Sequence, residues 1–218
     1  YTTAAAMVAC VEMALERGHA HGLEGQCVVI LGGTGPVGRI AGVIAARAGA
    51  EVYLSSRNGI DVAEDAARAT GTRFGVTLHG LSGGDPAALH ASLGRADVLL
   101  ACAAAGVQVV SAEALAFATR LKVAADVNAV PPQGIAGVGV MDDAQPLAGT
   151  AAVGIGALVV GNVKYQTQHR LLVQMQQSGK AVVLSFPEAH AVAREFLAEK
   201  VAKVPTDQTS EPAAGGPN

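Results

Sequence analysis

The sequence contains few aromatic and few charged residues. Aromatic residues make up 3% of the chain, tryptophan is absent, and charged residues make up 15%. Soluble domains usually carry about 25% charged residues, so we expect this chain to bury an unusually large share of its surface within itself or against partners. The net charge of −3 gives no positive excess for a phosphate backbone, which argues against nucleic-acid binding.

Cysteine is also scarce. Cys10, Cys27 and Cys102 are an odd number at no metal-ligand spacing, so we predict neither a disulfide framework nor a metal site. No charged segment followed by an apolar core opens the chain, so no signal peptide is expected and the expected compartment is the cytoplasm. Residues 144–163 lack charge, but Pro146 and several glycines interrupt them. We therefore predict a buried loop and strand around a ligand there, and no membrane association.

Apolar and small residues are plentiful. Half of the residues are apolar, with a mean hydropathy of +0.37, and this excludes a disordered chain, which needs low hydropathy and high charge. Glycine reaches 27 residues, and alanine is abundant. So many small side chains indicate helices packed closely on a sheet and backbone that approaches a ligand.

Short apolar runs alternate with segments of helical periodicity. Each run is continuously apolar, which is typical of strands that are buried on both faces of a parallel sheet. The predicted strands span residues 26–31, 51–54, 73–78, 96–101 and 121–126. The predicted helices span residues 4–17, 37–48, 61–69, 86–93, 113–119, 162–177 and 185–203. This order predicts one α/β domain, a Rossmann-type doubly wound parallel sheet with leading and closing helices.

The two ends of the chain differ from its middle. A helical pattern begins at once after Thr2 and Thr3, which suit a helix N-cap, so the sequence reads as a piece of a longer protein. We predict a connecting helix in residues 1–22 and a Rossmann domain with C-terminal helices in residues 23–203. Residues 204–218 have the composition of a disordered tail.

The sharpest motif is a glycine-rich loop between the first strand and the helix after it. It reads Gly33-Thr34-Gly35-Pro36-Val37-Gly38, a G-x-G-x-x-G pattern. The first glycine allows a tight turn, the second lets a pyrophosphate approach the backbone, and the third lets the helix pack close to the strand. The N–H groups of the helix N-terminus then face the anion. This context predicts dinucleotide binding, with a purely structural turn as the alternative.

The end of the second strand indicates which dinucleotide binds. An NAD site usually places an acid there for the ribose 2′-hydroxyl, whereas this strand ends in Ser55-Ser56-Arg57. Two hydroxyls and a guanidinium suit a 2′-phosphate, because arginine binds phosphate oxygens in a bidentate manner. We therefore predict NADP, with NAD also possible; the alternative is a solvated arginine on a loop.

Three stretches together resemble a known family. They are residues 2–6, the glycine loop, and residues 125–135, whose Asp-x-Asn-Ala-x-Pro-Pro-x-Gly-Ile pattern generic Rossmann domains lack. The chain is similar to the NAD(P)-dependent methylenetetrahydromethanopterin dehydrogenases, which are related to the methylenetetrahydrofolate dehydrogenases. Residues 154–157, 161–164 and 169–170 add to the likeness, which extends from Thr2 to about Lys203.

The resemblance implies a two-domain protein that binds its pterin in the cleft between the domains, with the N-terminal substrate domain missing from this sequence. The implied reaction transfers a hydride from the methylene group of methylenetetrahydromethanopterin, or of the folate analogue, to NADP. The protein then mainly places two rings face to face and excludes water. Lys164 resembles the lysine that the family places in its cleft, and it would orient the pterin.

Other residues are candidates by position. Asp126 ends a strand at the carboxyl edge of the sheet, where open α/β folds bind ligands, and Asn128 follows closely. We expect Asp126 to take part in catalysis and Asn128 to bind cofactor; the alternative for Asp126 is a carboxylate that ties a loop. Cys102 and Ala103 follow the fourth strand, where small residues let the backbone lie against the nicotinamide ribose. We expect the thiol of Cys102 itself to be only buried.

Two other functions stay open. One is a different two-domain NADP-dependent dehydrogenase, such as the shikimate type, and the other is a non-catalytic module that senses NADP(H). The low charge also suggests that an apolar face meets a partner, so we expect a homo-oligomer, although the missing domain could cover the same face.

Overall fold

The structure, a computed structural model, describes residues 1–19 and 21–203. The predicted disordered tail, residues 204–218, lies outside the described residues. The helices are α1 (Thr2–His19), α2 (Pro36–Arg47), α3 (Ile60–Phe74), α4 (Pro86–Arg95), α5 (Ala112–Leu115), α6 (Ala157–Gln177) and α7 (Phe186–Ala202). The strands are β1 (Cys27–Leu31), β2 (Glu51–Ser56), β3 (His79–Ser82), β4 (Val98–Ala101), β5 (Val123–Asp126), β6 (Asp143–Pro146) and β7 (Val153–Ile155).

In the described part of the chain, these strands form one sheet in the order β3-β2-β1-β4-β5-β7-β6. All neighbouring strands run parallel except the pair β6–β7 at one edge, which is antiparallel. The order reverses between β1 and β4, and open α/β sheets bind ligands at such a reversal. The predicted Rossmann-type doubly wound fold is confirmed.

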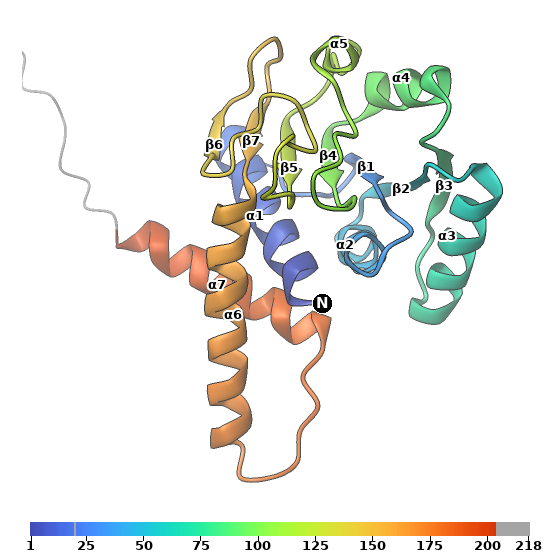
Figure 1. Ribbon diagram of the computed structural model, residues 1–218. Coiled ribbons are helices and arrows are strands. Elements are labelled where there is room, and N and C mark those ends of the chain that lie inside the picture. The colour runs from blue at the N-terminus through green and yellow to red at the C-terminus, as the bar shows by residue number, and fades with distance from the viewer. Residues whose placement is uncertain (20, 204–218) are drawn as a thin grey trace, which may run out of the picture.

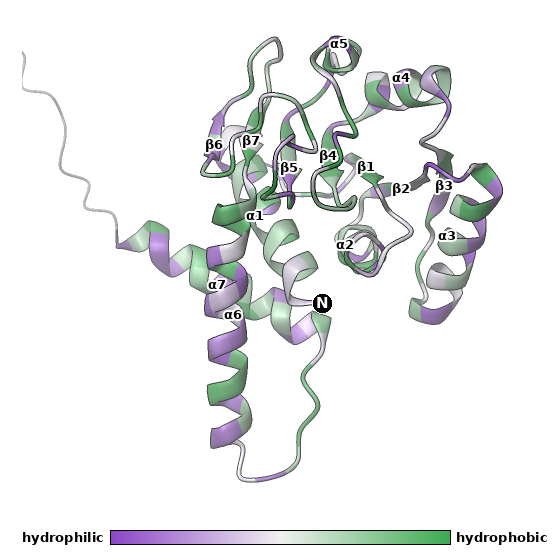
Figure 2. Cartoon of the chain, viewed as in Figure 1, coloured by the Kyte–Doolittle hydropathy of each residue, from purple (hydrophilic) through white to green (hydrophobic). Residues whose placement is uncertain are grey.

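Alternate residues of the central strands enter two separate hydrophobic layers. Val28 and Ile30 of β1 face α1, α2, α6 and α7, whereas Val29 and Leu31 face α4, α5 and the segment 135–152. Figure 1 shows this arrangement, with α4 and α5 on one side of the sheet and the longer helices on the other. Figure 2 shows that β1 and β4 are largely hydrophobic, whereas β6 and α3 carry many hydrophilic residues. The central strands β1, β4 and β5 are therefore buried on both faces, which explains their continuous apolar sequence.

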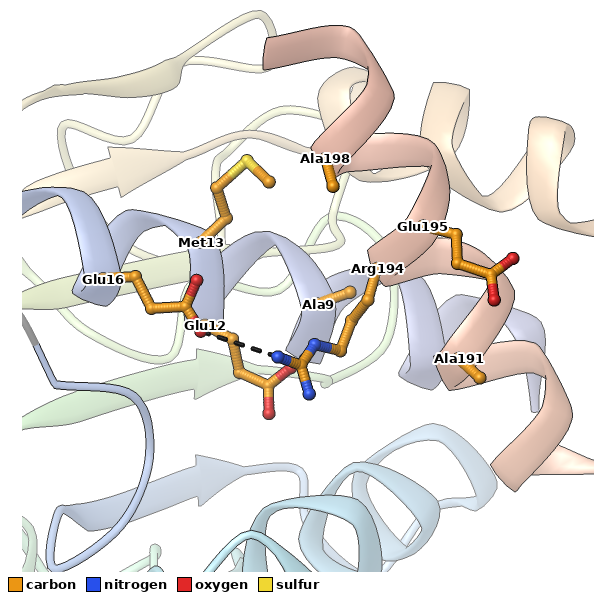
Figure 3. A pocket seen from close by; sticks show the side chains of 8 residues that line it. All are labelled: Ala9, Glu12, Met13, Glu16, Ala191, Arg194, Glu195 and Ala198. Atoms are coloured by element: carbon orange, nitrogen blue, oxygen red, sulfur yellow. Dashed lines mark ion pairs between the residues drawn. The ribbon is translucent and has the colours of Figure 1, made fainter. Parts of the chain in front are cut away.

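Helices α1 and α7 are joined by ion pairs. Glu12 of α1 is buried and lies 2.8 Å from His190 Nε2 and 3.6 Å from Arg194 Nε. The Arg194 guanidinium also lies 3.6 Å from Glu16 (Figure 3). The groove between the two helices, with a volume of about 380 Å³, is lined partly by these charged side chains. Because most of these charges pair with one another, we assign the groove a structural role.

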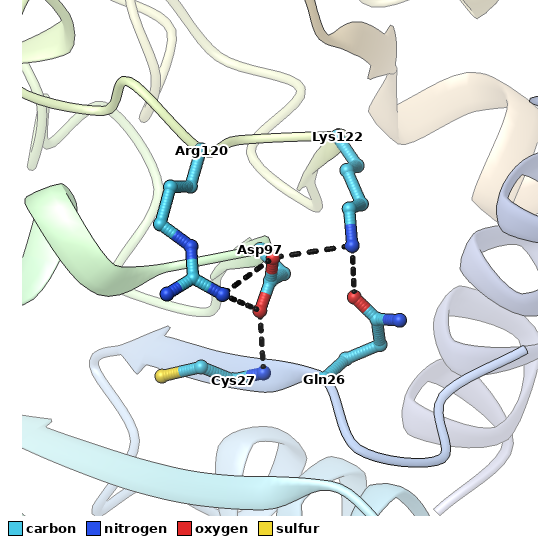
Figure 4. Close-up of polar contacts among 5 residues, drawn as sticks. All are labelled: Gln26, Cys27, Asp97, Arg120 and Lys122. Atoms are coloured by element: carbon cyan, nitrogen blue, oxygen red, sulfur yellow. Dashed lines mark hydrogen bonds and ion pairs between the residues drawn. The ribbon is translucent and has the colours of Figure 1, made fainter. Parts of the chain in front are cut away.

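A second polar cluster lies where β1 and β4 begin. The buried carboxylate of Asp97 accepts a hydrogen bond from the Cys27 N–H (3.0 Å) and lies 3.2 Å from Lys122 Nζ and 3.4 Å from Arg120 Nη2 (Figure 4). Lys122 also donates to Gln26 Oε1 at 2.7 Å. This cluster joins the starts of three neighbouring strands at the edge of the sheet opposite the glycine loop.

Three predicted boundaries differ from the structure. The strand predicted at 73–78 is wrong, because α3 continues to Phe74, Gly75 ends it in the left-handed region at φ 67°, and β3 follows at His79–Ser82. The helix predicted at 113–119 is only the short α5. The helix predicted at 162–177 begins earlier, at Ala157. The uncharged stretch 144–163 holds β7, most of β6 and the start of α6.

None of the helices among the described residues is long and apolar enough to cross a membrane. In the same residues, no group of three or more histidine, cysteine or acidic side chains lies close enough together to hold a metal ion.

Candidate functional site

A cleft of about 420 Å³ opens where the strand order reverses. Its walls are the loops that follow β1, β2 and β4, with contributions from the loop after β3 and from α4. The lining residues are Leu31, Gly32, Thr34, Gly35, Ser55, Ser56, Arg57, Asn58, Gly83, Leu89, Cys102, Ala103, Ala104, Val107, Gln108 and Val109. The fold thus brings together the segments 31–35, 55–58 and 102–109, which lie far apart in the sequence.

The glycines of the loop after β1 differ in how much space the protein leaves for a side chain. A Cβ on Gly33 would come within 2.8 Å of the Leu54 Cα, and a Cβ on Gly38 would come within 2.7 Å of the Gly33 Cα. Both positions therefore require glycine for packing inside the protein. A Cβ on Gly35 would meet only the Gly32 oxygen, at an ordinary 3.5 Å. Of these three motif glycines, Gly35 is therefore the one that the packing of the protein itself does not require.

The N-terminus of α2 is held ready for an anion. Gly35 is the N-cap and makes no side-chain capping bond, and Pro36 occupies the first turn, where a missing N–H is harmless. The side chain of Arg39 donates to the Thr34 oxygen at 2.7 Å and so fixes the loop. The first-turn N–H groups of a helix without a side-chain cap favour a negatively charged ligand.

The end of β2 supplies the polar wall of the cleft. Ser55 and Ser56 are buried, whereas Arg57 is exposed. The Ser56 hydroxyl accepts a hydrogen bond from the Asn58 N–H at 3.1 Å, which shapes the turn. Among the described residues that line the cleft, Arg57 is the one charged side chain. An anionic group at this end of the cleft would therefore meet one guanidinium and two hydroxyls.

The loop after β4 forms the opposite wall. Cys102, Ala103 and Ala104 line the cleft, as do Val107 and Gln108 further along the same loop. Burial and, to a smaller extent, the nearby Asp126 carboxylate together raise the pKa of the Cys102 thiol to about 12. The thiol is therefore neutral near pH 7, and this wall presents small, uncharged groups.

Asp126 and Asn128 lie behind this wall, not among the residues that line the cleft. The Asp126 carboxylate is buried and accepts from the N–H groups of Asn128 (2.8 Å) and Ile135 (3.0 Å). The Asn128 side chain accepts from the N–H groups of Gly106 and Val130, both at 3.0 Å, and donates to the Pro132 oxygen at 2.7 Å. Both side chains hold loops through their polar atoms.

Lys164 lies apart from the cleft lining. It is half-buried on α6, between the buried Val163 and the exposed Tyr165. The structure thus brings the glycine loop, Ser55, Ser56, Arg57, Cys102 and Ala103 into one cleft, with Asp126 and Asn128 behind it and Lys164 on another element.

Some lining residues were not found from the sequence. Gly32, Asn58, Gly83, Leu89, Val107, Gln108 and Val109 also line the cleft. Gly32 and Asn58 directly adjoin predicted site residues, so their neighbourhood was a signal, whereas the other five lie further along the chain. Gly83 is more specific: a Cβ there would come within 2.8 Å of the Ser55 hydroxyl, so the loop after β3 must lie closely against the end of β2.

The sheet order, the glycine loop and the cleft define a Rossmann-type α/β domain. No family model matches the chain. The quinate dehydrogenase of Corynebacterium glutamicum, solved in complex with NAD, has a similar fold. Its TM-score is 0.55 at 14% sequence identity, and the match covers 91% of this chain and 62% of that one. At this level of identity the likeness concerns the fold alone.

Two curated proteins of Methylorubrum extorquens match at higher identity. The NAD(P)-dependent methylenetetrahydromethanopterin dehydrogenase is 43% identical over 196 residues, which is 90% of this chain and 66% of the relative. The bifunctional protein MdtA is 31% identical over 195 residues, covering 89% of this chain and 65% of the relative. The chain is a relative of the NAD(P)-dependent methylenetetrahydromethanopterin dehydrogenases, which confirms the resemblance, and it spans slightly less than two thirds of their length.

Proposed function

We propose that this chain is the NADP-binding part of an oxidoreductase of one-carbon metabolism. The reaction transfers a hydride from the methylene group of methylenetetrahydromethanopterin, or of methylenetetrahydrofolate, to NADP and gives the methenyl form. The observation that carries the proposal is the cleft at the strand reversal, with the glycine loop on one side and Arg57 on the other. The 43% identity to a protein of that name supports the substrate class.

The cofactor would lie across the ends of β2, β1 and β4. Its pyrophosphate would approach Gly35 and the first-turn N–H groups of α2, where a Cβ would block it and nothing in the protein does. The 2′-phosphate would bind Arg57, Ser55 and Ser56, because a guanidinium and hydroxyls satisfy phosphate oxygens. When bound, NADP supplies the nicotinamide C4 that accepts the hydride; NAD is a possible second cofactor.

We propose that Lys164 orients the pterin, as its resemblance to the family's cleft lysine implies. Lys164 is half-buried on α6, and a lysine ammonium can donate hydrogen bonds to the carbonyl oxygen of a pterin ring. Asp126 has its two oxygens on backbone N–H groups, so we assign it a contribution through the loops that it holds.

Arg57→Ala tests the cofactor assignment directly. Titration of the protein with NADPH and NADH should show weaker NADPH binding by about ten- to hundred-fold, since a hydrogen bond to a charged group is worth roughly 1.5–3 kcal/mol. NADH, which lacks the 2′-phosphate, should bind as before. Arg68→Ala is the matched control, because Arg68 is an exposed arginine paired with Asp65 on α3 and does not line the cleft. Equal loss of both cofactors, or none of either, would contradict the assignment.

Turnover distinguishes the enzyme from a sensor. Oxidation of methylenetetrahydromethanopterin and of methylenetetrahydrofolate should be measured separately, with Lys164→Ala raising the KM for the pterin and leaving the KM for NADP unchanged. Normal NADPH binding without turnover of either substrate by the whole gene product would favour the alternative of an NADP(H)-sensing module.

We also propose that the protein forms a homo-oligomer in the cytoplasm. Leu158, Tyr165 and Leu172 recur every seven residues on α6 and are 50%, 65% and 65% exposed. Exposed apolar residues in one stripe of a helix favour burial against a partner. Sedimentation of the protein and of Leu172→Glu should show an oligomer that the substitution weakens. Three free thiols among the described residues fit a reducing compartment.

A further inference from the structure

The cleft wall after β4 is fixed at both ends and in its middle by backbone hydrogen bonds. The Cys102 N–H donates to the Leu31 oxygen at 2.8 Å, which ties the start of the loop to β1. At the other end, the N–H groups of Val109 and Val110 both donate to the Gly134 oxygen, at 2.7 and 3.0 Å. Between these points, the Gly106 N–H donates to the Asn128 side chain at 3.0 Å.

The anchor in the middle, at Gly106, and the anchor at the far end, at Val109 and Val110, are both held by one segment, residues 126–136. Asp126 holds the N–H of Ile135, next to the Gly134 carbonyl that receives Val109 and Val110. A Cβ on Gly134 would come within 2.8 Å of the Asp126 oxygen, so the carboxylate also packs directly against this residue. Asn128, which Asp126 holds through its N–H, reaches Gly106 with its side chain. The buried side chains of Asp126 and Asn128 thus fix the cleft wall at Gly106 and at its far end, where Val109 and Val110 bind Gly134.

The wall between the anchors is the part that a cofactor would touch. Val107 and Gln108 lie between Gly106 and Val109 and line the cleft. In the sheet, β2 and β4 lie on opposite sides of β1. If the end of β2 takes the adenosine ribose and the loop after β1 takes the pyrophosphate, the loop after β4 is left for the nicotinamide half.

We propose that Asn128 and Asp126 are positioning residues that hold the wall 102–110, through Gly106 and Gly134, against the nicotinamide half of the bound cofactor. This inference rests on the proposed function, because it requires a dinucleotide in the cleft. It explains why the two most specific polar residues of the 126–135 segment face backbone groups instead of the cleft. The proposal also gives the two residues different roles: Arg57 distinguishes NADPH from NADH, whereas Asn128 contributes equally to the binding of both cofactors.

The test compares binding of NADPH and NADH to the wild type, Asn128→Ala and Asn128→Asp. Asn128→Ala removes the acceptor for Gly106 and Val130, and it should weaken both cofactors by about the same factor, roughly ten-fold. Asn128→Asp keeps the acceptor oxygens but cannot donate to Pro132, so it should recover part of the affinity. Thr150→Ala is the control: Thr150 also ties a loop, through Leu147 and Ala152, but does not line the cleft.

Hydrogen exchange supplies a readout that a general loss of stability would not give. In Asn128→Ala the amides of residues 103–110 should exchange faster, whereas those of β1 and β4 should keep their protection. In the wild type, NADPH should slow exchange in residues 103–110. This measurement needs no variant, so it applies even if Asn128→Ala does not fold.

Three results would overturn the proposal. The first is unchanged affinity of Asn128→Ala for both cofactors, and the second is a loss confined to NADPH, which would place the effect at the end of β2. The third is a wild type that binds NADPH without any protection of residues 103–110. A wild type that binds neither cofactor would instead refute the proposed function on which this inference rests.

Discussion

Two buried aspartates, at opposite ends of neighbouring strands, have opposite electrostatic surroundings. Asp97 precedes β4 and is 3% exposed, while Asp126 ends β5 and is 2% exposed. Asp97 has Lys122 and Arg120 within 3.4 Å in addition to the Cys27 N–H. Asp126 accepts hydrogen bonds from backbone N–H groups and has no cationic side chain as a partner in the described residues.

The pKa values of the two carboxyl groups follow from this difference. Burial raises the pKa of Asp97, but the Cys27 N–H, Lys122 and Arg120 together outweigh it, and the net shift is downward. For Asp126, burial also raises the pKa, and the hydrogen bonds from the backbone do not outweigh it, so the net shift is upward. The cations thus stabilise the charged form of Asp97 and let it stabilise the fold strongly. Asp126 holds loops beside the cleft, but its buried charge has no cation among the described residues to compensate it.

The largest expected difference lies in stability. Asp97→Asn should lower the free energy of unfolding by about 3 kcal/mol, near the low end for a broken buried ion pair, because Lys122 and Arg120 can turn to water. Their side chains are 29% and 62% exposed. Urea unfolding of the wild type and of Asp97→Asn near pH 7 measures this difference in the free energy of unfolding. Asp65→Asn, in an exposed aspartate–arginine pair on α3, is the control and should cost less than about 0.5 kcal/mol.

Asp126→Asn should cost less, about 1 kcal/mol. The amide replaces one acceptor oxygen and leaves one of the two N–H groups unsatisfied, but it also removes a buried charge that no cation compensates. Urea unfolding under the same conditions gives the comparison. A cost equal to that of Asp97→Asn would show that the cations contribute little to the difference between the two sites.

The losses of unfolding free energy in Asp97→Asn and Asp126→Asn should change with pH in opposite directions. A lowered pKa gives stability that is present above the ordinary value of 3.8 and is lost as the pH falls through the folded-state pKa. The deficit of Asp97→Asn should therefore shrink on acidification. A raised pKa gives stability that is lost as the pH rises, so the deficit of Asp126→Asn should be larger at about pH 4 than at about pH 7. Deficits that move in the same direction would refute the comparison.

The smallest expected effect concerns the Cys102 thiol, whose pKa the Asp126 carboxylate raises. Burial contributes more than Asp126 to its raised pKa of about 12. Iodoacetamide should therefore label Cys102 slowly near pH 8 in the wild type, and Asp126→Asn should change the rate by no more than about two-fold, because the thiolate stays scarce. Mass spectrometry of the labelled peptide measures it. A large acceleration would mean that the carboxylate, not burial, controls the thiol.

The sequence predicted the central parallel strands because each is a buried apolar run. It could not place β3, because Arg73–Leu78 has the composition of a strand while the chain there completes α3. The helix passes Gly71 because that glycine packs on the Val76 oxygen, where a Cβ would come within 2.6 Å. Strand β6, Asp143–Pro146, could not be predicted from the sequence either, because it is mostly exposed and forms only by pairing with β7.

The glycine loop and the end of β2 were predictable as a site because their chemistry is local in sequence. Asp126 and Asn128 were recognisable from their motif, but their hydrogen bonds reach Ile135 and Gly106, and only the fold shows that they hold the loop after β4. The partners of Asp97 were hidden for the same reason, since Cys27 lies seventy positions away.

The edge of the sheet at β6 limits how copies of this protein can associate. Ala144 has φ 54° and interrupts the register with β7, and Pro146 lacks an N–H for a further ladder. Asp143 at the start of the strand is bound to Lys200 of α7 at 3.0 Å. Such an edge disfavours joining of sheets between molecules. The β6 edge therefore opposes assembly through a continuous intermolecular sheet on this side, and so opposes fibrous aggregation through it.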